Sequence, residues 1–398
     1  MKQIKKGSTI KAFDFDEFMR KNGLATDENN KESGIADKPM SFIPMPKAFE
    51  NAIKLPGFPM GYMSIITGWS NTGKSTLISC LIASCVKNGI IPIIYDTENN
   101  FEFKYAVNCG LNAKPIYGIK EYEVVDEETG EINIEEREEI VDWKGKFVYL
   151  NSKRLAKKYG NNNYATGKQE SKYRTDAVIE DIAYSINDFI EQQENGDIQM
   201  PLCFIWDSVG SISSYKSYTS KVGNNMFDAG ALSVAFNSIL NNKIPSSRKT
   251  DSKYTNTFVC VNKIWNDSMN SVMGAPSIEL KGGKSFFYAA RLIIHLGGIA
   301  KSSIKKLTAT AKGSTYQYGT VSKMRVNKNQ LPTPFNVTYE GEIACVHNGL
   351  CSIEDLDNYK KTYIKDILKN IESQFGSSGS DKIKESEIEF DEEEIIDV

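Results

Sequence analysis

The chain of 398 residues has only two histidines, His295 and His347, and its seven cysteines include no Cys-x-x-Cys pair. Structural zinc sites usually draw on such pairs or on closely spaced histidines, so a metal centre built from these residues is not expected. Cys203 and Cys260 lie inside apolar runs, which favours buried free thiols in a reducing compartment over disulfides.

Long apolar runs are also absent. None approaches the roughly 20 residues that a membrane span requires. The first residues, "MKQIKKGSTIKAFDFDEF", lack the apolar core of a signal peptide. We therefore expect a soluble, cytoplasmic protein with no membrane partner.

Acidic residues are missing from one long stretch. Between Leu280 and Tyr339 there are ten lysines and arginines and no acid, whereas Glu385 to Val398 hold eight acids and no base. Blocks of one sign indicate a face that binds a polyanion and an acidic tail, although a solvated basic face is the plainer alternative.

Short apolar runs at 62–67, 91–96, 202–207, 257–262 and 291–296 predict strands that are covered on both faces, as in parallel sheets. Helical patterns separate them, at 75–89 and at 175–196, where Val178, Ile182, Ile186 and Ile190 follow a four-residue spacing. This alternation predicts an α/β fold with a mostly parallel central sheet covered by helices.

The predicted division of the chain has five parts. An apolar N-terminal helix, suited to packing on another subunit, is followed by a polar linker, an ATPase core, a helix and a disordered acidic tail. Within the core, one charged stretch with a candidate hairpin at "DEETGE" is expected to form a surface insertion. The bounds are 1–21, 22–41, 42–350 with the insertion at 119–172, 351–372 and 373–398.

The segment "GWSNTGKST" follows an apolar strand, precedes a helix and matches G-x-x-x-x-G-K-[ST]. In this motif backbone N–H groups surround phosphates, the lysine neutralises them and the serine ligates Mg²⁺. The candidate nucleotide contacts are Gly68, Trp69, Ser70, Asn71, Thr72, Gly73, Lys74, Ser75 and Thr76.

Two further strands end in carboxylates. Asp207, at the end of "LCFIWDS", is the candidate second Mg²⁺ group, or else a helix cap. Asp96 and Glu98 follow "IIY", and either could orient the attacking water or cap a helix; their spacing does not choose between them.

Four segments together carry a family resemblance. In order along the chain, "LPGFPMGYMSIITGWSNTGKSTL", "YDTENNFEFKYAVNCGL", "FIWDSVGSI" and "VNKIWNDSMNSVMGAPSIELKGGKSFFYAARLIIHL" resemble the successive motifs of RecA-family recombinases. The resemblance covers about 42–340, apart from the insertion, and in character it is most like the UvsX-type recombinases of tailed bacteriophages. A phage origin would place the protein in the host cytoplasm.

The resemblance implies ATP and Mg²⁺ as cofactors, with Ser75 and Asp207 at the metal. It implies Glu98 as the general base, with Lys74 and Lys328 as further catalytic groups, Lys328 reaching the ATP of a neighbouring subunit. Two positions depart from the family. Lys263 stands where a glutamine senses the γ-phosphate, and Gln330 stands where a second interface lysine is usual; Lys323 and Arg325 are candidate substitutes.

The resemblance also implies two DNA-binding loops. The loop from Trp265 to Gly283 would insert apolar side chains between base steps and contact phosphates; the loop from Ser213 to Asn225 would stack on bases and bind the backbone. Local packing is the alternative for each aromatic or methionine. The candidate DNA contacts are Tyr215, Lys216, Lys221, Trp265, Met269, Met273, Lys281 and Lys284.

The resemblance therefore predicts a DNA-dependent ATPase that forms helical homo-oligomeric filaments on single-stranded DNA and exchanges strands with double-stranded DNA. Single-stranded-DNA-binding proteins and mediator proteins are further candidate partners. The alternative is a RecA-fold hexameric helicase or related DNA-dependent motor, and a third class is an ATP-binding regulator without catalysis.

Overall fold

The computed structural model describes residues 14–22, 36–125, 132–220, 225–262, 264–266, 278–280, 283–298, 303–373 and 383–395. Its helices are α1 (Phe15–Lys21), α2 (Lys47–Ile53), α3 (Lys74–Lys87), α4 (Phe103–Asn108), α5 (Ser152–Tyr159), α6 (Ile179–Glu194), α7 (Tyr215–Ser220), α8 (Asn225–Ser238), which continues through a π-helical turn into α9 (Ile244–Ser246), α10 (Gly283–Ala289) and α11 (Leu356–Glu372). Its strands up to residue 209 are β1 (Phe42–Pro44), β2 (Gly57–Pro59), β3 (Met63–Gly68), β4 (Ile91–Asp96), β5 (Ala113–Val125), β6 (Ile132–Gly145), β7 (Val148–Asn151), β8 (Asn162–Asn163), β9 (Lys168–Gln169) and β10 (Leu202–Val209). The later strands are β11 (Thr257–Asn262), β12 (Ile264–Asn266), β13 (Ile278–Leu280), β14 (Leu292–Leu296), β15 (Ile304–Ala311), β16 (Ser314–Asn329), β17 (Glu340–Val346), β18 (Gly349–Cys351) and β19 (Glu389–Ile395).

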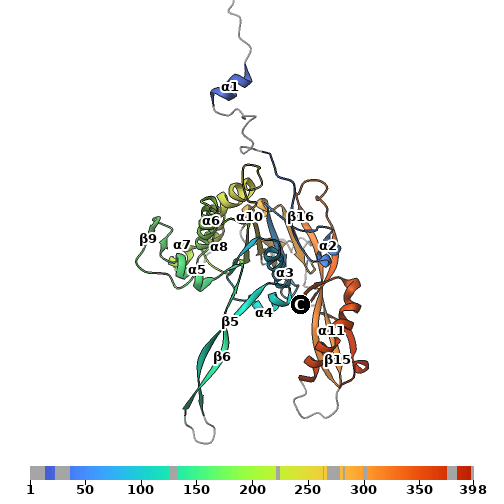
Figure 1. Ribbon diagram of the computed structural model, residues 1–398. Helices are drawn as coiled ribbons and strands as arrows, with labels where there is room; N and C mark the ends of the chain where they lie inside the picture. Colours follow the sequence, from blue (N-terminus) through green and yellow to red (C-terminus); the bar gives the residue numbers. More distant parts are fainter. Residues whose placement is uncertain are drawn as a thin grey trace, which may run out of the picture.

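One large mixed sheet organises the described residues. Its strand order is β18-β17-β16-β14-β3-β11-β10-β4-β7, with β15 paired to β16 and β19 paired to β15. The neighbours from β14 to β7 all run parallel, and the pairs from β14 through β16 and β17 to β18 are antiparallel. The five strands predicted from apolar runs are all present and lie side by side in the parallel part, so the α/β prediction is confirmed (Figure 1).

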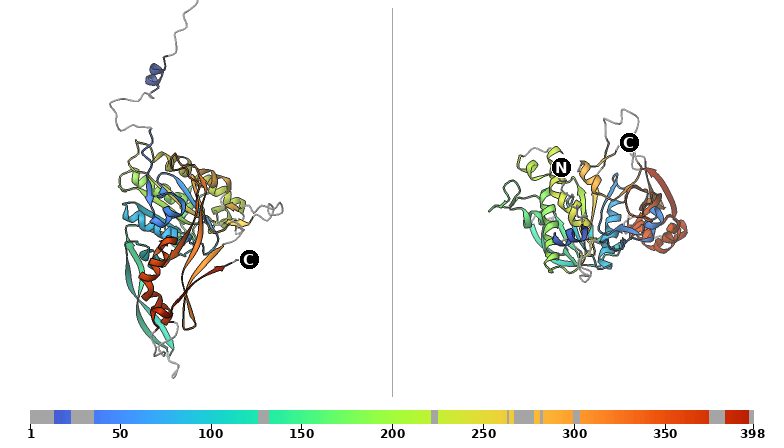
Figure 2. Two further views of the ribbon diagram at one scale, coloured as in Figure 1. Left: turned by 90° about the vertical axis from the view of Figure 1, so that its right-hand side faces the viewer. Right: turned by 90° about the horizontal axis from the view of Figure 1, so that it is seen from above.

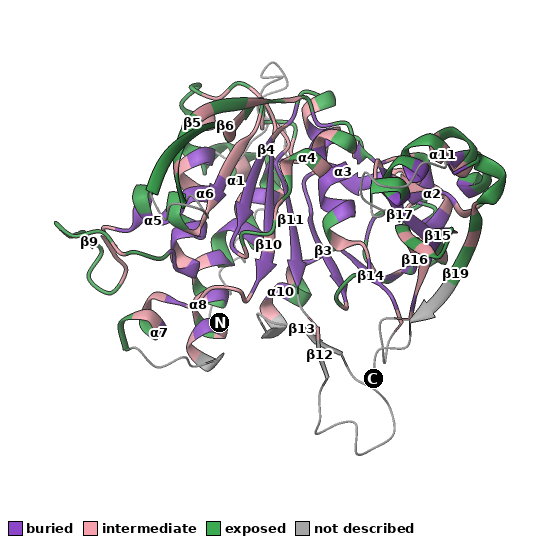
Figure 3. Ribbon diagram, turned by 90° about the horizontal axis from the view of Figure 1, so that it is seen from below, coloured by how far each residue is buried: buried purple, intermediate pink, exposed green. Residues whose placement is uncertain are grey.

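Helices cover both faces of the parallel part because its strands are apolar on both sides. In β10, Cys203 and Ile205 join the core that contains α3, whereas Phe204 and Trp206 join the core that contains α6 and α8. Alternate residues of a strand point to opposite faces. Figure 3 shows these buried strands between the two helical layers.

The long antiparallel strands build a third core beside the first two. Leu307 of β15 and Tyr318 of β16 pack with Tyr359 and Ile371 of α11. The prediction of a disordered tail over 373–398 is wrong for its last part, because β19 pairs with β15 from Glu389 to Ile395. Composition alone suggested disorder, whereas an edge strand with lysines was available to pair with these acids.

The predicted insertion at 119–172 has different bounds and is only partly a surface feature. β5 and β6 pair antiparallel from Ala113–Gly145 to Val125–Ile132, so the expected hairpin is present, and it extends away from the sheet (Figures 1 and 2). However, β7 is a strand of the main sheet and α5 packs into the core through Leu155. β7 is only four residues long, and the charged sequence around it masked its apolar character.

Helix α1 falls within the predicted N-terminal arm, and Asp14 caps it by accepting a hydrogen bond from the backbone N–H of Glu17. Phe15 and Phe18 lie on its surface with their ring centroids 6.4 Å apart. Phe13 lies outside the described residues. None of the helices in the described part of the chain combines the length and apolar character needed to cross a membrane.

Candidate nucleotide-binding edge

The carboxyl ends of the parallel strands meet at one edge of the sheet. β3 runs into the G-x-x-x-x-G-K-S loop, and Asp96 of β4 lies directly beside Asp207 of β10. In open α/β sheets, ligands bind at this edge. A cavity of about 460 Å³ opens there, and Lys74, Ser75, Glu98 and Asp207 all line it.

The phosphate-binding loop has a backbone that its glycines permit. Gly68 and Gly73 have φ angles of 150° and 94°, a region that favours glycine. A side chain at Gly73 would also collide with the sulfur of Cys345, 2.3 Å from the added carbon. Thr72 closes the loop by donating its hydroxyl to the carbonyl of Trp69 at 2.8 Å. The loop therefore leads its backbone N–H groups into the start of α3, where the helix dipole favours an anion.

Lys74 lies inside this loop. Its ammonium donates to the carbonyl oxygens of Gly68, at 2.9 Å, and of Trp69. The lysine is thus held at the cavity by backbone oxygens, which a phosphate oxygen can replace as acceptors.

Asp96 and Glu98 differ in burial and in hydrogen-bond partners. Asp96 is buried, with an exposed fraction of 2%, and accepts hydrogen bonds from the N–H groups of Asn100 and Phe101 and from the hydroxyl of Tyr149 at 2.8 Å. Glu98 lines the cavity, where it accepts hydrogen bonds from the hydroxyl of Ser208 and from the side-chain amide of Asn100. Asp96 therefore positions the turn that follows β4, and Glu98 is the carboxylate that faces the cavity.

Ser75 and Asp207 line the same cavity, as expected of a serine and an aspartate that share one Mg²⁺ with bound phosphates. A carboxylate and a hydroxyl are oxygen donors of the kind that Mg²⁺ prefers. The residues present therefore fit this ion.

A second cavity, of about 450 Å³, lies on the other side of the phosphate-binding loop and shares Asn71, Lys74 and Ser75 with the first. Tyr105 contributes to its wall, exchanges a hydrogen bond with the hydroxyl of Thr76 at 2.9 Å and donates to the carbonyl of Val346. Tyr318 also lines it, and its buried hydroxyl has no hydrogen-bond partner among the described residues.

Sequence reasoning missed the wall of this second cavity. Tyr105 lies seven residues beyond Glu98 and could have been suspected from that proximity. Tyr318 comes from β16, more than 200 residues from the loop, and no local pattern connects the two.

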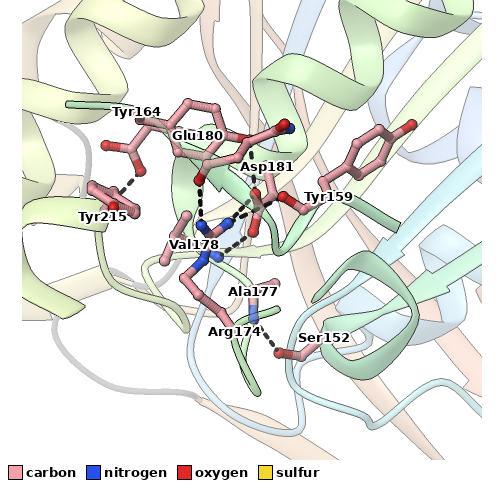
Figure 4. Close-up of polar contacts among 10 residues, drawn as sticks. Ser152, Tyr159, Tyr164, Arg174, Ala177, Val178, Glu180, Asp181 and Tyr215 are labelled. Carbon is pink, nitrogen blue, oxygen red and sulfur yellow. Dashed lines mark hydrogen bonds and ion pairs between the residues drawn. The ribbon is translucent and has the colours of Figure 1, made fainter. Parts of the chain in front are cut away.

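The expected DNA-binding loop at 213–225 contains helix α7, and Tyr215 at its start is half buried. The backbone N–H of Tyr215 donates to Glu180, and its ring lies 5.2 Å from the guanidinium of Arg174 (Figure 4). Lys216 is exposed and its ammonium lies 4.0 Å from the ring centroid of Phe227. The described contacts of Tyr215 are thus local, as in the packing alternative left open above, and Lys216 is exposed to solvent.

Arg174 forms the centre of a buried polar cluster (Figure 4). Its guanidinium makes an ion pair with Asp181 at 2.5 Å, and the two side chains have exposed fractions of 9% and 0%. Asp181 also accepts hydrogen bonds from the hydroxyl of Tyr164 and the N–H of Val178. Burial raises the pKa of Asp181 against the opposing effect of these donors. The cluster fixes the segment after α5 to the start of α6 and to α7.

The structure describes only some of the remaining predicted site residues. Lys328 donates its ammonium to the carbonyl oxygens of Phe287, at 2.6 Å, and Tyr288. Lys323 and Arg325, the candidate substitutes, both lie within ion-pair distance of Glu340. Trp265 is described only as part of β12, paired with Glu279 of β13, and Lys284 only as part of α10. Lys221, Lys263, Met269, Met273 and Lys281 lie outside the described residues.

Parts of the chain are similar in sequence to known proteins. A stretch of 66 residues, 17% of the chain, is 36% identical to Protein RecA of Campylobacter jejuni subsp. doylei and covers 19% of that protein. The chain is distantly similar to bacterial RecA proteins. It also matches Protein RecA of Herpetosiphon aurantiacus, at 30% identity over 27% of the chain and 29% of that protein, and Protein RecA of Mycoplasma mobile, at 32% over 20% and 26%.

The matched stretches thus span less than a third of these relatives' own length. No protein-family model matches the chain. Together with the α/β sheet and the phosphate-binding loop, the partial similarity is consistent with a RecA-like core.

Proposed function

We propose that this protein is an ATP- and Mg²⁺-dependent DNA recombinase of the RecA type, with UvsX-like phage recombinases as the nearest functional model. It polymerises on single-stranded DNA and promotes pairing and strand exchange. The observation that carries the proposal is the cavity that brings Lys74, Ser75, Glu98 and Asp207 together at the phosphate-binding loop. The partial similarity to RecA proteins favours recombination over other uses of such a loop.

Each of the two cavities binds a different part of the nucleotide. The triphosphate lies over the loop, where backbone N–H groups and Lys74 bind its oxygens. The base and ribose extend into the second cavity, whose aromatic side chains, Tyr105 and Tyr318 among them, suit a planar base.

Glu98 acts on the water that attacks the γ-phosphate. It faces the cavity, and the hydroxyl of Ser208 and the amide of Asn100 hold its carboxylate in place. Orienting and deprotonating a water requires this kind of fixed carboxylate. Mg²⁺, held by Ser75 and Asp207, would supply charge compensation for the phosphates.

DNA binding is assigned to the side of the sheet edge that carries the two loops. The exposed Lys216 and the ten lysines and arginines of the acid-free stretch from Leu280 to Tyr339 provide positive charge. Contacts of this kind fix the phosphate backbone without reading sequence.

The test is electron microscopy of the full chain with single-stranded DNA and a nonhydrolysable ATP analogue, together with ATPase assays. Open helical filaments and DNA-stimulated hydrolysis are expected. Closed rings would instead support a hexameric motor. ATP binding with neither rings nor filaments would support a regulator.

The Lys74→Ala variant should lose hydrolysis, because the phosphates lose their main cationic partner. Its matched control is Lys87→Ala, at the exposed far end of the same helix α3, which should leave activity unchanged. Hydrolysis at the wild-type rate in Lys74→Ala would refute the assignment of the phosphate site.

A further inference from the structure

The β5–β6 hairpin has two unlike faces. The two strands are 13 and 14 residues long, and directly opposite residues share a face. The register places Ile119 opposite Glu138 and Glu121 opposite Glu136 on one face, and Lys120 opposite Arg137 on the other. We call these the Ile119 face and the Lys120 face.

The charged side chains of the Lys120 face form ion pairs and hydrogen bonds with one another. Lys120 pairs with Glu139 at 2.9 Å, and the hydroxyl of Tyr122 donates to the same carboxylate at 2.7 Å. Arg137 pairs with Glu135 and lies over the ring of Tyr122. These cross-strand contacts stabilise the hairpin without any partner.

The Ile119 face leaves both its apolar and its charged groups uncovered. Ile119, Ile134 and Ile132 have exposed fractions of 70%, 67% and 64%. Four carboxylates lie among them, and none forms an ion pair with a described residue: Glu121, Glu123, Glu136 and Glu138. Glu121 directly opposite Glu136 is a like-charge pair, which destabilises a hairpin.

Such a face calls for a partner that is both apolar and basic. A hairpin of two strands is marginally stable by itself in water, and exposed isoleucines on this scale mark an interaction site. Four carboxylates repel nucleic acid, so the partner is a protein surface with lysines or arginines.

The chain itself carries a surface of that chemistry. Phe287 and Tyr288 of α10 are exposed, at 41% and 67%, and Lys328 lies over the ring of Phe287. They belong to the stretch from Leu280 to Tyr339 that holds no acid. Within one molecule the two surfaces belong to different parts of the sheet, since the hairpin leaves next to β4 and α10 leads into β14, with β3, β11 and β10 between. A second copy can bring them together.

We propose that the Ile119 face of one copy docks on the Phe287–Lys328 surface of the next copy. This inference rests on the proposed function, in which copies assemble around ATP. The base of the hairpin packs on helix α4, because Trp143, on the same face, stacks on Phe103 with ring centroids 5.6 Å apart, and Phe103 lies five residues after Glu98. A contact between two different surfaces repeats from copy to copy and builds either a closed ring or an open helical polymer.

The first test compares two double variants of the full chain by sedimentation with the nonhydrolysable ATP analogue and single-stranded DNA. Ile119→Ser with Ile134→Ser should raise the protein concentration needed for assembly at least tenfold and leave ATP affinity per molecule unchanged. The control, Val124→Ser, changes an exposed apolar residue on the opposite face of the same hairpin, leaves its ion pairs in place and should assemble nearly as the wild type does. Unchanged assembly of the isoleucine variant would overturn the proposal.

The second test locates the partner surface. Carbodiimide treatment of mixed light and ¹⁵N-labelled copies should yield mixed-isotope cross-links between the hairpin glutamates and lysines of the 280–339 stretch, Lys328 first. Cross-links only within one copy, or to lysines elsewhere, would overturn it. A wild-type protein that binds ATP but stays monomeric refutes the docking and leaves ATP binding intact. Wild-type hydrolysis by Lys74→Ala refutes the phosphate site, while the cross-links still decide the docking.

Discussion

The phosphate-binding cavity and the Arg174 cluster both bring charged side chains together beside the same sheet. The two sites differ in how those charges are compensated. In the cavity, Lys74 and Glu98 face open space and are held by backbone carbonyls, a hydroxyl and an amide. In the cluster, Arg174 and Asp181 are enclosed and paired with each other. Groups that face a cavity can exchange their partners for a ligand, whereas enclosed pairs can only hold the structure. The comparison separates residues for chemistry from residues for architecture.

The largest effect is expected at the cavity. Glu98→Gln should slow ATP hydrolysis by about 10²–10⁴-fold, because the amide cannot take the proton of the attacking water. ATP binding and stability to urea should stay as in the wild type, and filaments should last longer. Single-turnover hydrolysis and nucleotide titration measure this, with Asp96→Asn as the contrasting variant that loses stability instead. Wild-type turnover in Glu98→Gln would assign the base elsewhere.

The Arg174 cluster should show the opposite behaviour. Arg174→Ala leaves Asp181 buried without its cation and should destabilise the protein by about 3–5 kcal/mol. Urea denaturation measures the loss, and a double-mutant cycle with Asp181→Asn separates the pair from the packing of the arginine. Hydrolysis per folded molecule without DNA should not change. A loss below about 1 kcal/mol would mean that water reaches the cluster.

The stability of the protein should depend on pH through His295, near the phosphate-binding loop. Its ring lies between the hydroxyl of Thr67 and the carbonyl of Gly298, and burial lowers the pKa of His295 below its ordinary 6.5. The unfolded chain therefore takes up a proton that the folded state resists, so stability is complete above pH 6.5 and falls as the pH drops toward the folded pKa. The slope should reach at most about 1.4 kcal/mol per pH unit. His295→Gln should flatten it in urea titrations between pH 7.5 and 5; an unchanged slope would exclude His295.

The smallest effect is expected at an exposed pair near the cluster. Lys158 and Asp188 lie 3.1 Å apart, with exposed fractions of 47% and 30%. Lys158→Ala should cost at most about 1 kcal/mol, because water screens the pair. Measured beside Arg174→Ala, it shows whether burial, and not the ion pair itself, produces the large loss. Equal losses in the two variants would remove that distinction.

Sequence patterns located the parallel strands well and the additions around them poorly. Runs such as "IPIIYD" are apolar on both faces, and that pattern is local. β7 and β19 were not predicted because β7 is short and β19 is charged. Each becomes a strand only beside its neighbour: β7 pairs with β4, and β19 pairs with β15. The spacing of Asp96 and Glu98 left two candidates for the base, and only the turn after β4 shows which carboxylate is enclosed.

By itself, the sequence determined the phosphate-binding loop, the positions of the core strands along the chain and the separation of basic and acidic blocks. These depend on contacts between residues close in the chain, on the freedom of Gly68 and Gly73 and on apolar periodicity. Tertiary structure alone decided that Tyr318 lines the nucleotide edge, that Arg174 is buried with Asp181 and that the Ile119 face stands uncovered. Each depends on which distant segments are brought together, and pairing over such separations leaves no mark on the local pattern.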